Sequence, residues 1–212
     1  MLTDRQSRPL PALTSPQDPP SKREILEAAL RLFARHGLHA VTIRDIADAA
    51  GYSNPAIFKF FKSKESLAIF LFERCYTGIY EKLATRVEAD SSFDGRIRAI
   101  LETFLEQMEC DASGLLFVQD HLRELWPHVS KATRSRSIVG VFRKVLNSGV
   151  KQGAVSAQSN IELLSAAMLG ALVQFARLAY FGEFRRPLKQ YAAELETILR
   201  KIAISSIRTA FT

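Results

Sequence analysis

Four cationic side chains lie close together in the stretch TIRDIADAAGYSNPAIFKFFKSKESL, residues 42–67. Lys59, Lys62 and Lys64 follow one another in its second half, and Arg44 precedes them. Amine and guanidinium groups at such positions can neutralise phosphates on either side of a nucleic-acid groove. A lysine can also donate to the edge of a guanine, and we expect Lys59 to do so. The chemistry available to this stretch is therefore recognition of a polyanion.

The cations flank two predicted short helices that meet at Gly51. Gly51 tolerates the backbone conformation of a tight turn, and Ala47 is small enough for a close helix crossing. Thr42 can cap the first of these helices, with Asp45 at the carboxylate position of a capping box. This spacing predicts a helix-turn-helix; the alternative is an ordinary helical hairpin. The apolar residues expected to hold the pair together are Ile43, Ile46, Ala50, Ile57 and the phenylalanines at 58, 60 and 61, which should lock the second helix onto its scaffold.

The rest of the chain also has a helical pattern. Its 212 residues are 47% apolar, enough for a core, and apolar residues recur at helical intervals between glycines and prolines. We predict an all-α protein in which an N-terminal three-helix domain is joined by a long helix to a larger helical domain. The first helix should begin at a capping box, Ser21 to Glu24, and end at Gly37. Later helices are expected at 63–89, from 93, and at 115–125, 129–151, 160–181 and 188–210.

The ends of the chain and its cysteines bear on domains and compartment. Residues 1–20 hold five of the eight prolines and lack the apolar core of a signal peptide, so we expect a disordered arm. Residues 21–67 would form the DNA-binding domain, and the family resemblance described next implies that residues 68–212 form an effector-binding and dimerisation domain. Two cysteines without partners at metal spacing indicate a reducing, cytoplasmic location. The apolar stretch 161–181 is interrupted by Glu162, Gln174 and Arg177, which favours a buried helix over a membrane span.

At the residues just described the sequence resembles a known family. The segment 42–67, with the preceding REILEAALRLFARHGLHAVT, is similar to the DNA-binding signature of TetR-type transcriptional regulators. The resemblance covers roughly residues 22–70 and continues beyond only as architecture. It implies a recognition helix from about Asn54 to Phe60 in the major groove of a palindromic operator. It also implies a homodimer and a small-molecule effector that releases a repressor. The phosphate contacts that it implies are Thr42, Arg44, Tyr52, Lys62 and Lys64.

Two positions depart from the family pattern. Positions 58 and 60 commonly carry tyrosine, and because Phe58 has no hydroxyl group we do not expect it to contact phosphate or a base. Pro55 replaces a small residue; it favours the first helical position and makes Asn54 a natural N-cap. A capping Asn54 is less free to read adenine, and the choice between these roles stays open. Lys59 is then the main base reader, with lesser contacts from Ser53, Asn54 and Ala56.

The larger domain should carry the dimer interface and the effector site. One recognition helix covers few base pairs, so we expect a dimer. Its two DNA-binding domains, called heads below, should lie about 34 Å apart, which is one turn of the DNA helix. The last two helices can form a four-helix bundle across a two-fold axis, or can pack within one subunit instead. The interface candidates are Leu163, Ala167, Gly170, Ala171, Phe175, Ile198 and Ile202. The effector-pocket candidates, whose alternative role is ordinary core, are Phe104, Met108, Phe117, His121, Trp126, Phe142, Gln174 and Tyr180.

Other classes of function are less well supported by the sequence. The four histidines, at 36, 39, 121 and 128, do not accompany a phosphate loop, a nucleophile elbow or a paired-ligand helix motif. We therefore expect no enzyme activity, no cofactor and no metal. The net charge of +7 and the pI near 9.6 are also compatible with a basic helical interaction module that binds polyanions without sequence preference. We expect no membrane partner.

Overall fold

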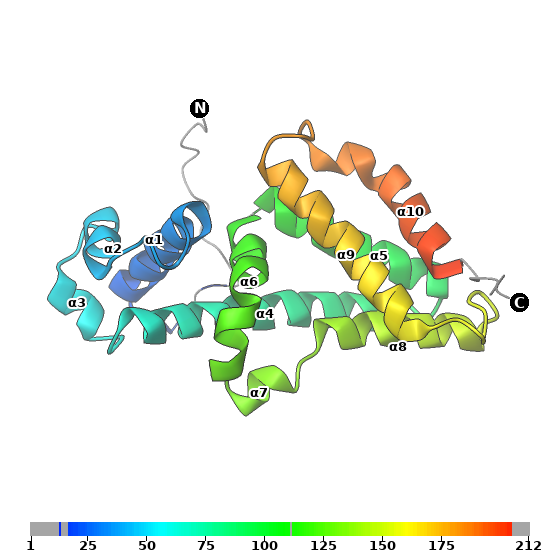
Figure 1. Ribbon diagram of the computed structural model, residues 1–212, viewed down its shortest axis with the longest axis horizontal. Helices are drawn as coiled ribbons and strands as arrows, with labels where there is room; N and C mark the ends of the chain where they lie inside the picture. Colours follow the sequence, from blue (N-terminus) through cyan, green and yellow to red (C-terminus); the bar gives the residue numbers. More distant parts are fainter. Residues whose placement is uncertain (1–12, 14–16, 111, 205–212) are drawn as a thin grey trace, which may run out of the picture. The chain divides into compact units, whose positions relative to one another are not determined.

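The computed structural model describes residue 13 and residues 17–110 and 112–204, and in these residues the chain contains helices and no strands (Figure 1). This confirms the predicted all-α class. The α-helices are α1 (Pro20–His36), α2 (Ile43–Ala50), α3 (Asn54–Phe58), α4 (Lys64–Glu88), α5 (Phe93–Cys110), α6 (Ala112–Leu125), α7 (Lys131–Arg134), α8 (Ile138–Lys151), α9 (Ile161–Tyr180) and α10 (Ala192–Ile204). Short 3₁₀ turns occupy Trp126–His128 and Leu188–Tyr191.

By its internal contacts the chain divides into two compact units. The first contains the described residues up to Gly78 together with Ser113–Arg134, and the second contains Ile79–Ala112 and the described residues from Ser135 onward. Helix α4 runs through both units without a break. Packing therefore groups α6 and α7 with α1, α2 and α3. The functional boundary expected between residues 67 and 68 stays a prediction.

In the first unit, aromatic rings join α6 and the turn after it to α1 and α4. Phe33 of α1 is buried and stacks on Phe117 of α6 with 5.7 Å between ring centroids. Tyr76 of α4 lies against Trp126 at 5.0 Å, and Phe72 stacks on Tyr76. Aromatic pairs of this kind add to the stabilisation that comes from burial alone. Helix α2 packs on α1, and α3 packs on α2.

The start of α1 differs from the prediction. The helix begins at Pro20 after Pro19, with no side-chain capping bond, so the expected capping box at Ser21 does not form. A proline at the first helical position lacks only an N–H that has no helical partner there, and its φ is already helical. Part of the predicted disordered arm is also ordered: Leu13 and Asp18 are buried, and the Asp18 carboxylate binds Lys22 at 2.8 Å. Residues 1–12 and 14–16 lie outside the described residues.

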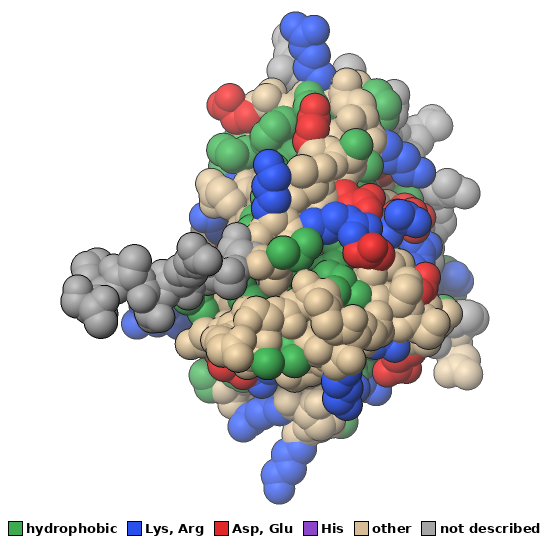
Figure 2. Space-filling model, turned by 90° about the vertical axis from the view of Figure 1, so that its right-hand side faces the viewer, with side chains coloured by type: hydrophobic (Ala, Val, Ile, Leu, Met, Phe, Trp, Pro, Cys, Tyr) green, Lys and Arg blue, Asp and Glu red, His purple; other side chains and the backbone are tan. Residues whose placement is uncertain are grey.

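In the second unit, α8 packs on α9, and α10 packs on α5 and α9. The helix predicted from residue 93 is present as α5. One apolar side of it is in the core, where Phe104 is half-buried and these residues are buried: Ile97, Ile100, Leu101, Leu105 and Met108. On the surface, Arg200 of α10 binds Asp94 and Arg98 binds Glu196, which links α5 to α10 through ion pairs. Figure 2 shows acidic and basic side chains side by side near the middle of one face of the molecule.

Helix α9 is only partly buried, whereas the sequence favours a buried helix. It is long and apolar enough to cross a membrane by length and composition, but only 33% of that apolar stretch is buried. One face, with Leu164, Met168 and Leu172, is in the core, whereas the opposite face is exposed. The exposed residues include small and aliphatic side chains at 163, 166, 167, 170 and 178 together with the polar or charged Glu162, Gln174 and Arg177. The sequence hides this division because polar residues are few and apolar residues occur on both faces.

Two predicted helices are also shorter than expected. The stretch 129–151 is interrupted, and α8 begins only after Ser137, whose hydroxyl accepts a hydrogen bond from the amide of Gly140 at 2.9 Å. The last helix begins at Ala192 after a 3₁₀ turn and is described to Ile204. Its predicted continuation to 210 lies outside the described residues.

Candidate nucleic-acid interface

The start of α2 is fixed by a capping box. The Thr42 hydroxyl accepts from the amide of Asp45 at 3.2 Å, and the Asp45 carboxylate accepts from the amide of Thr42 at 2.8 Å. The hydrogen bond from the Thr42 backbone, with that from its side chain, lowers the pKa of the Asp45 carboxyl. This confirms the predicted cap. It also means that the Thr42 hydroxyl has an internal partner before any phosphate approaches.

Gly51 makes the turn between α2 and α3. Its φ is +73°, in the left-handed region that side chains with a Cβ rarely adopt. The following amide, that of Tyr52, donates to the carbonyl of Ala47 at 2.9 Å and closes the end of α2. Ile57 of α3 is fully buried, whereas most of its neighbours in α3 are exposed. The predicted helix-turn-helix is therefore present, and its second helix, α3, is short and has Ile57 as its buried residue.

Helix α3 is shorter than predicted and begins differently. It spans Asn54–Phe58, with Ser53 as N-cap residue and no side-chain capping bond. Of the two roles left open for Asn54, capping is not the one seen here: its exposed amide group has no hydrogen-bond partner within the described residues. Lys59 stands at the C-terminal cap rather than inside the helix. The side chain of Asn54 is consequently available to a base, together with exposed Ser53 and half-buried Ala56.

Three cations around α3 are accessible. Lys59 and Lys62 are exposed, and in the described part of the chain neither ammonium group has an ion-pair or hydrogen-bond partner. Arg44 on α2 is exposed and lies 3.8 Å from the Asp48 carboxylate, a distance at which an exposed ion pair is weak. These groups can reorient towards phosphates at small cost. In the sequence they lie on the helix before α3, at the end of α3 and just after it.

Tyr52 and Lys64, two predicted phosphate contacts, have partners inside the protein. The Tyr52 hydroxyl donates to the carboxylate of Glu24 in α1, and this bond raises the pKa of Tyr52. The half-buried Lys64 ammonium donates to the carbonyl oxygens of Leu38 and Val41 at 3.0 and 2.9 Å. A tyrosine hydroxyl has one hydrogen to donate, so Tyr52 cannot donate to a phosphate as long as it is bonded to Glu24. An ammonium group has three, so Lys64 keeps one donor that could bind a phosphate. The phosphate contacts of both residues stay predictions, whereas their hydrogen bonds within the first unit are seen in the structure.

The three phenylalanines of this segment have different surroundings. Phe61 is buried and its ring meets that of Phe70 in α4 edge to face, with centroids 5.4 Å apart. Phe60 is half-buried and lies 6.5 Å from Phe61. Phe58 is 51% exposed. The expectation that all three lock α3 onto its scaffold is wrong for Phe58, and the sequence pattern does not signal this because the residue sits in an apolar, aromatic-rich run.

The eight predicted effector residues are divided between the two units. Phe117, His121 and Trp126 belong to the first unit, and the other five belong to the second. In the first unit, Phe117 contacts Phe33 and His121, as core residues do. In the second, Met108 and Phe142 are buried, Phe104 lies 6.2 Å from the ring of Phe175, Tyr180 is half-buried and Gln174 is exposed. A polar group that sequence reasoning missed is Gln119 of α6: both atoms of its amide are buried and have no partner within the described residues.

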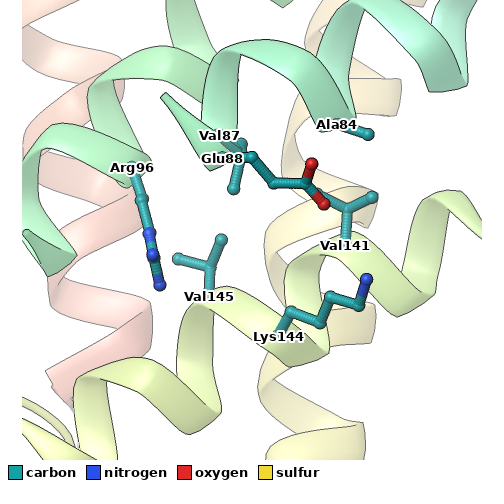
Figure 3. Close-up of a pocket in the computed structure, with 7 residues that line it drawn as sticks. All are labelled: Ala84, Val87, Glu88, Arg96, Val141, Lys144 and Val145. Atoms are coloured by element: carbon teal, nitrogen blue, oxygen red, sulfur yellow. The ribbon is translucent and has the colours of Figure 1, made fainter. Parts of the chain in front are cut away.

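A small cavity lies in the second unit between α4, α5 and α8 (Figure 3). Its volume is about 110 Å³, and Val87 of α4 faces Val145 of α8 across it. Charged side chains stand at its edge, and the full lining is Ala84, Val87, Glu88, Arg96, Val141, Lys144 and Val145. None of these residues is among the predicted effector contacts. A cavity of this size is below the range of pockets that hold drug-sized ligands.

The predicted dimer residues divide between surface and core. Leu163 is 51% and Ile198 46% exposed, and Ala167 and Gly170 of α9 are exposed as well. Ala171 and Ile202 are half-buried. Phe175 is buried, with its ring 4.6 Å from that of Phe184, so its contacts are internal and the interface prediction for it needs correction. The exposed apolar residues of α9, α10 and the adjoining loop also include Leu178, Phe181 and Ile204.

Comparison with known proteins agrees with this geometry. Residues 25–69 match the family model described as "Bacterial regulatory proteins, tetR family". The HTH-type transcriptional repressor KstR2 of Rhodococcus jostii (strain RHA1) is 30% identical over 146 residues, which cover 67% of this chain and 71% of the relative. The region matched by the family model contains the whole α2–α3 segment and its cations.

Solved structures share the fold over most of the chain. The ketosteroid transcriptional regulator KstR2 of Mycobacterium tuberculosis superposes with a TM-score of 0.74 at 22% identity, covering 87% of this chain and 95% of that one. The regulator FadR from Bacillus subtilis in complex with stearoyl-CoA superposes with a TM-score of 0.67 at 15% identity, covering 84% and 97%. At these identities the likeness establishes the architecture.

Proposed function

The chain belongs to the tetR family of bacterial regulatory proteins, and from this we propose that α3 is the operator-reading helix of a repressor that a small molecule releases. The protein is a ligand-responsive DNA-binding regulator rather than a basic module without sequence preference, and the relatives named above are regulators and not enzymes. The observation that carries the proposal is the exposed side of α3, which the capping box, the Gly51 turn and buried Ile57 hold in place.

We assign the phosphate contacts first to the accessible cations. Arg44 precedes α3 in the sequence and Lys62 follows it. Neither has a strong internal partner in the described residues. Lys64 can use its remaining donor, and Thr42 lies at the start of α2, where a phosphate is favoured. Tyr52 would have to release Glu24 before it could donate to a phosphate. These contacts position the head and give no sequence preference.

Base reading falls to the exposed polar side chains of α3 and its ends. Lys59 is our main candidate because its ammonium is unpaired within the described residues and can donate to guanine. The structure also supports Asn54 as a base-reading residue, because an amide that does not cap the helix is free to form two hydrogen bonds with adenine. Ser53 and Ala56 lie beside it as lesser contacts.

We propose that two copies pair through the exposed sides of α9 and α10. Leu163 and Ile198 supply apolar surface, while Ala167 and Gly170 allow close approach of a second helix. Small residues at a helix interface and apolar residues around them suit a four-helix bundle across a two-fold axis. The pairing would place two reading heads on one face of a palindromic operator. We also propose that this regulator acts in the cytoplasm, where the chromosome is.

The effector that we propose is a hydrophobic, lipid-derived compound or its acyl thioester. Support comes from the relatives, one described as a ketosteroid regulator and another solved with stearoyl-CoA. A site near α6 is supported by Gln119, because a buried amide without partners gains hydrogen bonds from a ligand that reaches it. The cavity of Figure 3 is too small for such a molecule.

The function is tested by selecting bound fragments from a genomic DNA library with the purified protein. The expected result is a set of fragments that share a palindrome, bound about a thousandfold or more tightly than bulk DNA at the same salt. Titration of acyl thioesters and ketosteroids onto that complex should release the DNA with one class of compound. Equal binding to all duplexes would reject the proposal, and release by none of the compounds would reject the effector class alone.

A further inference from the structure

Phe58 is an apolar ring on a surface where the described part of the chain provides nothing to cover it. It is 51% exposed, and in the described residues its ring makes no aromatic or cation contact. Its neighbours Phe60 and Phe61 both have aromatic partners. Phe58 lies four residues after Asn54 and three after Pro55, and residues at this spacing share one side of a helix. All three are exposed, so the ring belongs to the outward side of α3.

The cations that lie close to Phe58 in the sequence indicate the kind of partner that covers the ring. Lys59 and Lys62 have ammonium groups that are unpaired within the described residues, and Arg44 is held only by a loose pair with Asp48. A hydrophobic protein partner would have to bury these cations at a high desolvation cost. A DNA duplex instead offers phosphates to the cations and an apolar group to the ring. In the major groove that apolar group is the C5 methyl of thymine.

We propose that Phe58 is a specificity-determining residue that contacts the methyl group of one thymine in each half of the operator. The inference rests on the proposed function and extends it, because it adds readout by an apolar contact to readout by Lys59 and Asn54. It replaces the expectation, drawn from the missing hydroxyl group, that Phe58 contacts no base, and it gives the phenylalanine at this position a role of its own. A ring without a hydroxyl group fits against a methyl group, whereas it cannot donate a hydrogen bond to a phosphate.

The test uses the operator selected from the genomic library and the full-length protein. Each thymine in a half-site is replaced by deoxyuridine, which removes the methyl group and leaves base pairing unchanged. Burial of one methyl group corresponds to about fourfold in affinity, so replacement in both half-sites should weaken wild-type binding about 15-fold at one position. Phe58→Ala should bind the thymine operator correspondingly weakly and should not distinguish it from the uracil operator.

Three controls separate the contact from general damage. Phe58→Tyr keeps the ring and should keep the preference for thymine at that position. A cytosine placed there should bind weakly and 5-methylcytosine more tightly, because the methyl group is restored. Because Phe58 is half-exposed, Phe58→Ala should unfold at nearly the wild-type temperature.

The inference is overturned if no thymine shows a methyl effect, or if Phe58→Ala retains the full effect. It is also overturned if Phe58→Ala weakens every duplex by the same factor, since the ring would then contact only the sugar-phosphate backbone. In these cases the operator is still bound, so the proposed function survives. A protein that prefers no sequence overturns both.

Discussion

The hydroxyl group of Tyr52, just after the Gly51 turn, donates a hydrogen bond to the carboxylate of Glu24 in α1, 28 residues away along the chain. The bond fixes the end of α2 to the first helix. It also places a negative charge next to the surface that we propose to bind phosphates. Glu24 is exposed, so on the proposed binding surface its carboxylate would repel the phosphates of a duplex. The hydrogen bond thus holds α1 to the end of α2, while the charge of its acceptor would oppose the proposed DNA binding.

Replacement of Glu24 by Gln should strengthen DNA binding. The amide still accepts a hydrogen bond from Tyr52, but the repulsion between carboxylate and phosphate disappears. A unit charge close to another in water is worth ~1 kcal/mol, so we expect affinity to rise about three- to fivefold at low salt and less at high salt. Fluorescence anisotropy with labelled operator measures the change. Weaker binding by Glu24→Gln would contradict this interpretation.

The companion variant Glu24→Ala also frees the Tyr52 hydroxyl. If Tyr52 then donates to a phosphate, Glu24→Ala should bind more tightly than Glu24→Gln, and the additional Tyr52→Phe change should remove only that difference. Equal affinities of the two Glu24 variants would show that Tyr52 makes no phosphate contact. The matched pair thus tests the predicted role of Tyr52 without disturbing α3.

Replacing Lys59 by Ala and replacing Lys62 by Ala should change DNA binding in different ways. Lys59→Ala should reduce the preference for operator over mutated operator, by about 1 to 3 kcal/mol for each base that Lys59 reads. Lys62→Ala should weaken all duplexes alike and reduce the salt dependence by about one counterion for each phosphate that Lys62 neutralises. Competition binding at several salt concentrations separates the two patterns. A Lys62→Ala variant that alters base preference would reverse our assignment.

The elements of the head that depend on nearby residues could be predicted, whereas contacts across the fold could not. The capping box joins Thr42 to Asp45, and the Gly51 turn is closed by residues on either side, so local sequence determines both. Lys64 and Tyr52 looked like free surface groups because their partners lie far away in sequence: Val41 is 23 residues from Lys64. Only the tertiary packing of the first unit brings these pairs together.

Exposure was the other property that the sequence could not determine. Leu163 and Phe175 have similar apolar neighbours in α9, yet one is half-exposed and the other is in the core. Phe58 and Phe61 differ in the same way. Helical periodicity assigns residues to a side of a helix, but it does not say which side meets the protein when both are apolar. The division of packing between two units had no sequence signal, because α4 continues through it.

Leu163→Glu should break the proposed dimer. Two-fold symmetry places two new carboxylates in one interface, and like charges across an interface cost several kcal/mol, so the dissociation constant should rise by at least about 100-fold. Sedimentation velocity measures the change, and operator affinity should fall with it. Leu122→Glu is the matched control, since Leu122 is 43% exposed but lies on α6 in the other unit. A dimer that withstands Leu163→Glu would place the interface elsewhere.

Glu73 should make stability depend on acid pH. Burial raises the pKa of its carboxyl, but hydrogen bonds from Ser130 and from the Thr133 hydroxyl outweigh burial and hold the pKa below its usual value. A pKa lowered on folding stabilises the protein above the unfolded value, here 4.5, and this contribution is lost as pH falls through the folded pKa. Glu73→Gln should therefore cost about 1.5 kcal/mol near neutral pH and progressively less in acid.

Urea unfolding at a series of pH values measures this contribution. The free energy of unfolding of the wild type should fall more steeply below pH 4.5 than that of Glu73→Gln, so the two curves converge. Glu102→Gln on α5 changes an exposed carboxylate without hydrogen bonds in the described structure and should leave the wild-type slope unchanged. Parallel curves for wild type and Glu73→Gln would mean that the charge of Glu73 does not stabilise the start of α7. The packing of α7 onto α4 would then have to rest on apolar contacts alone.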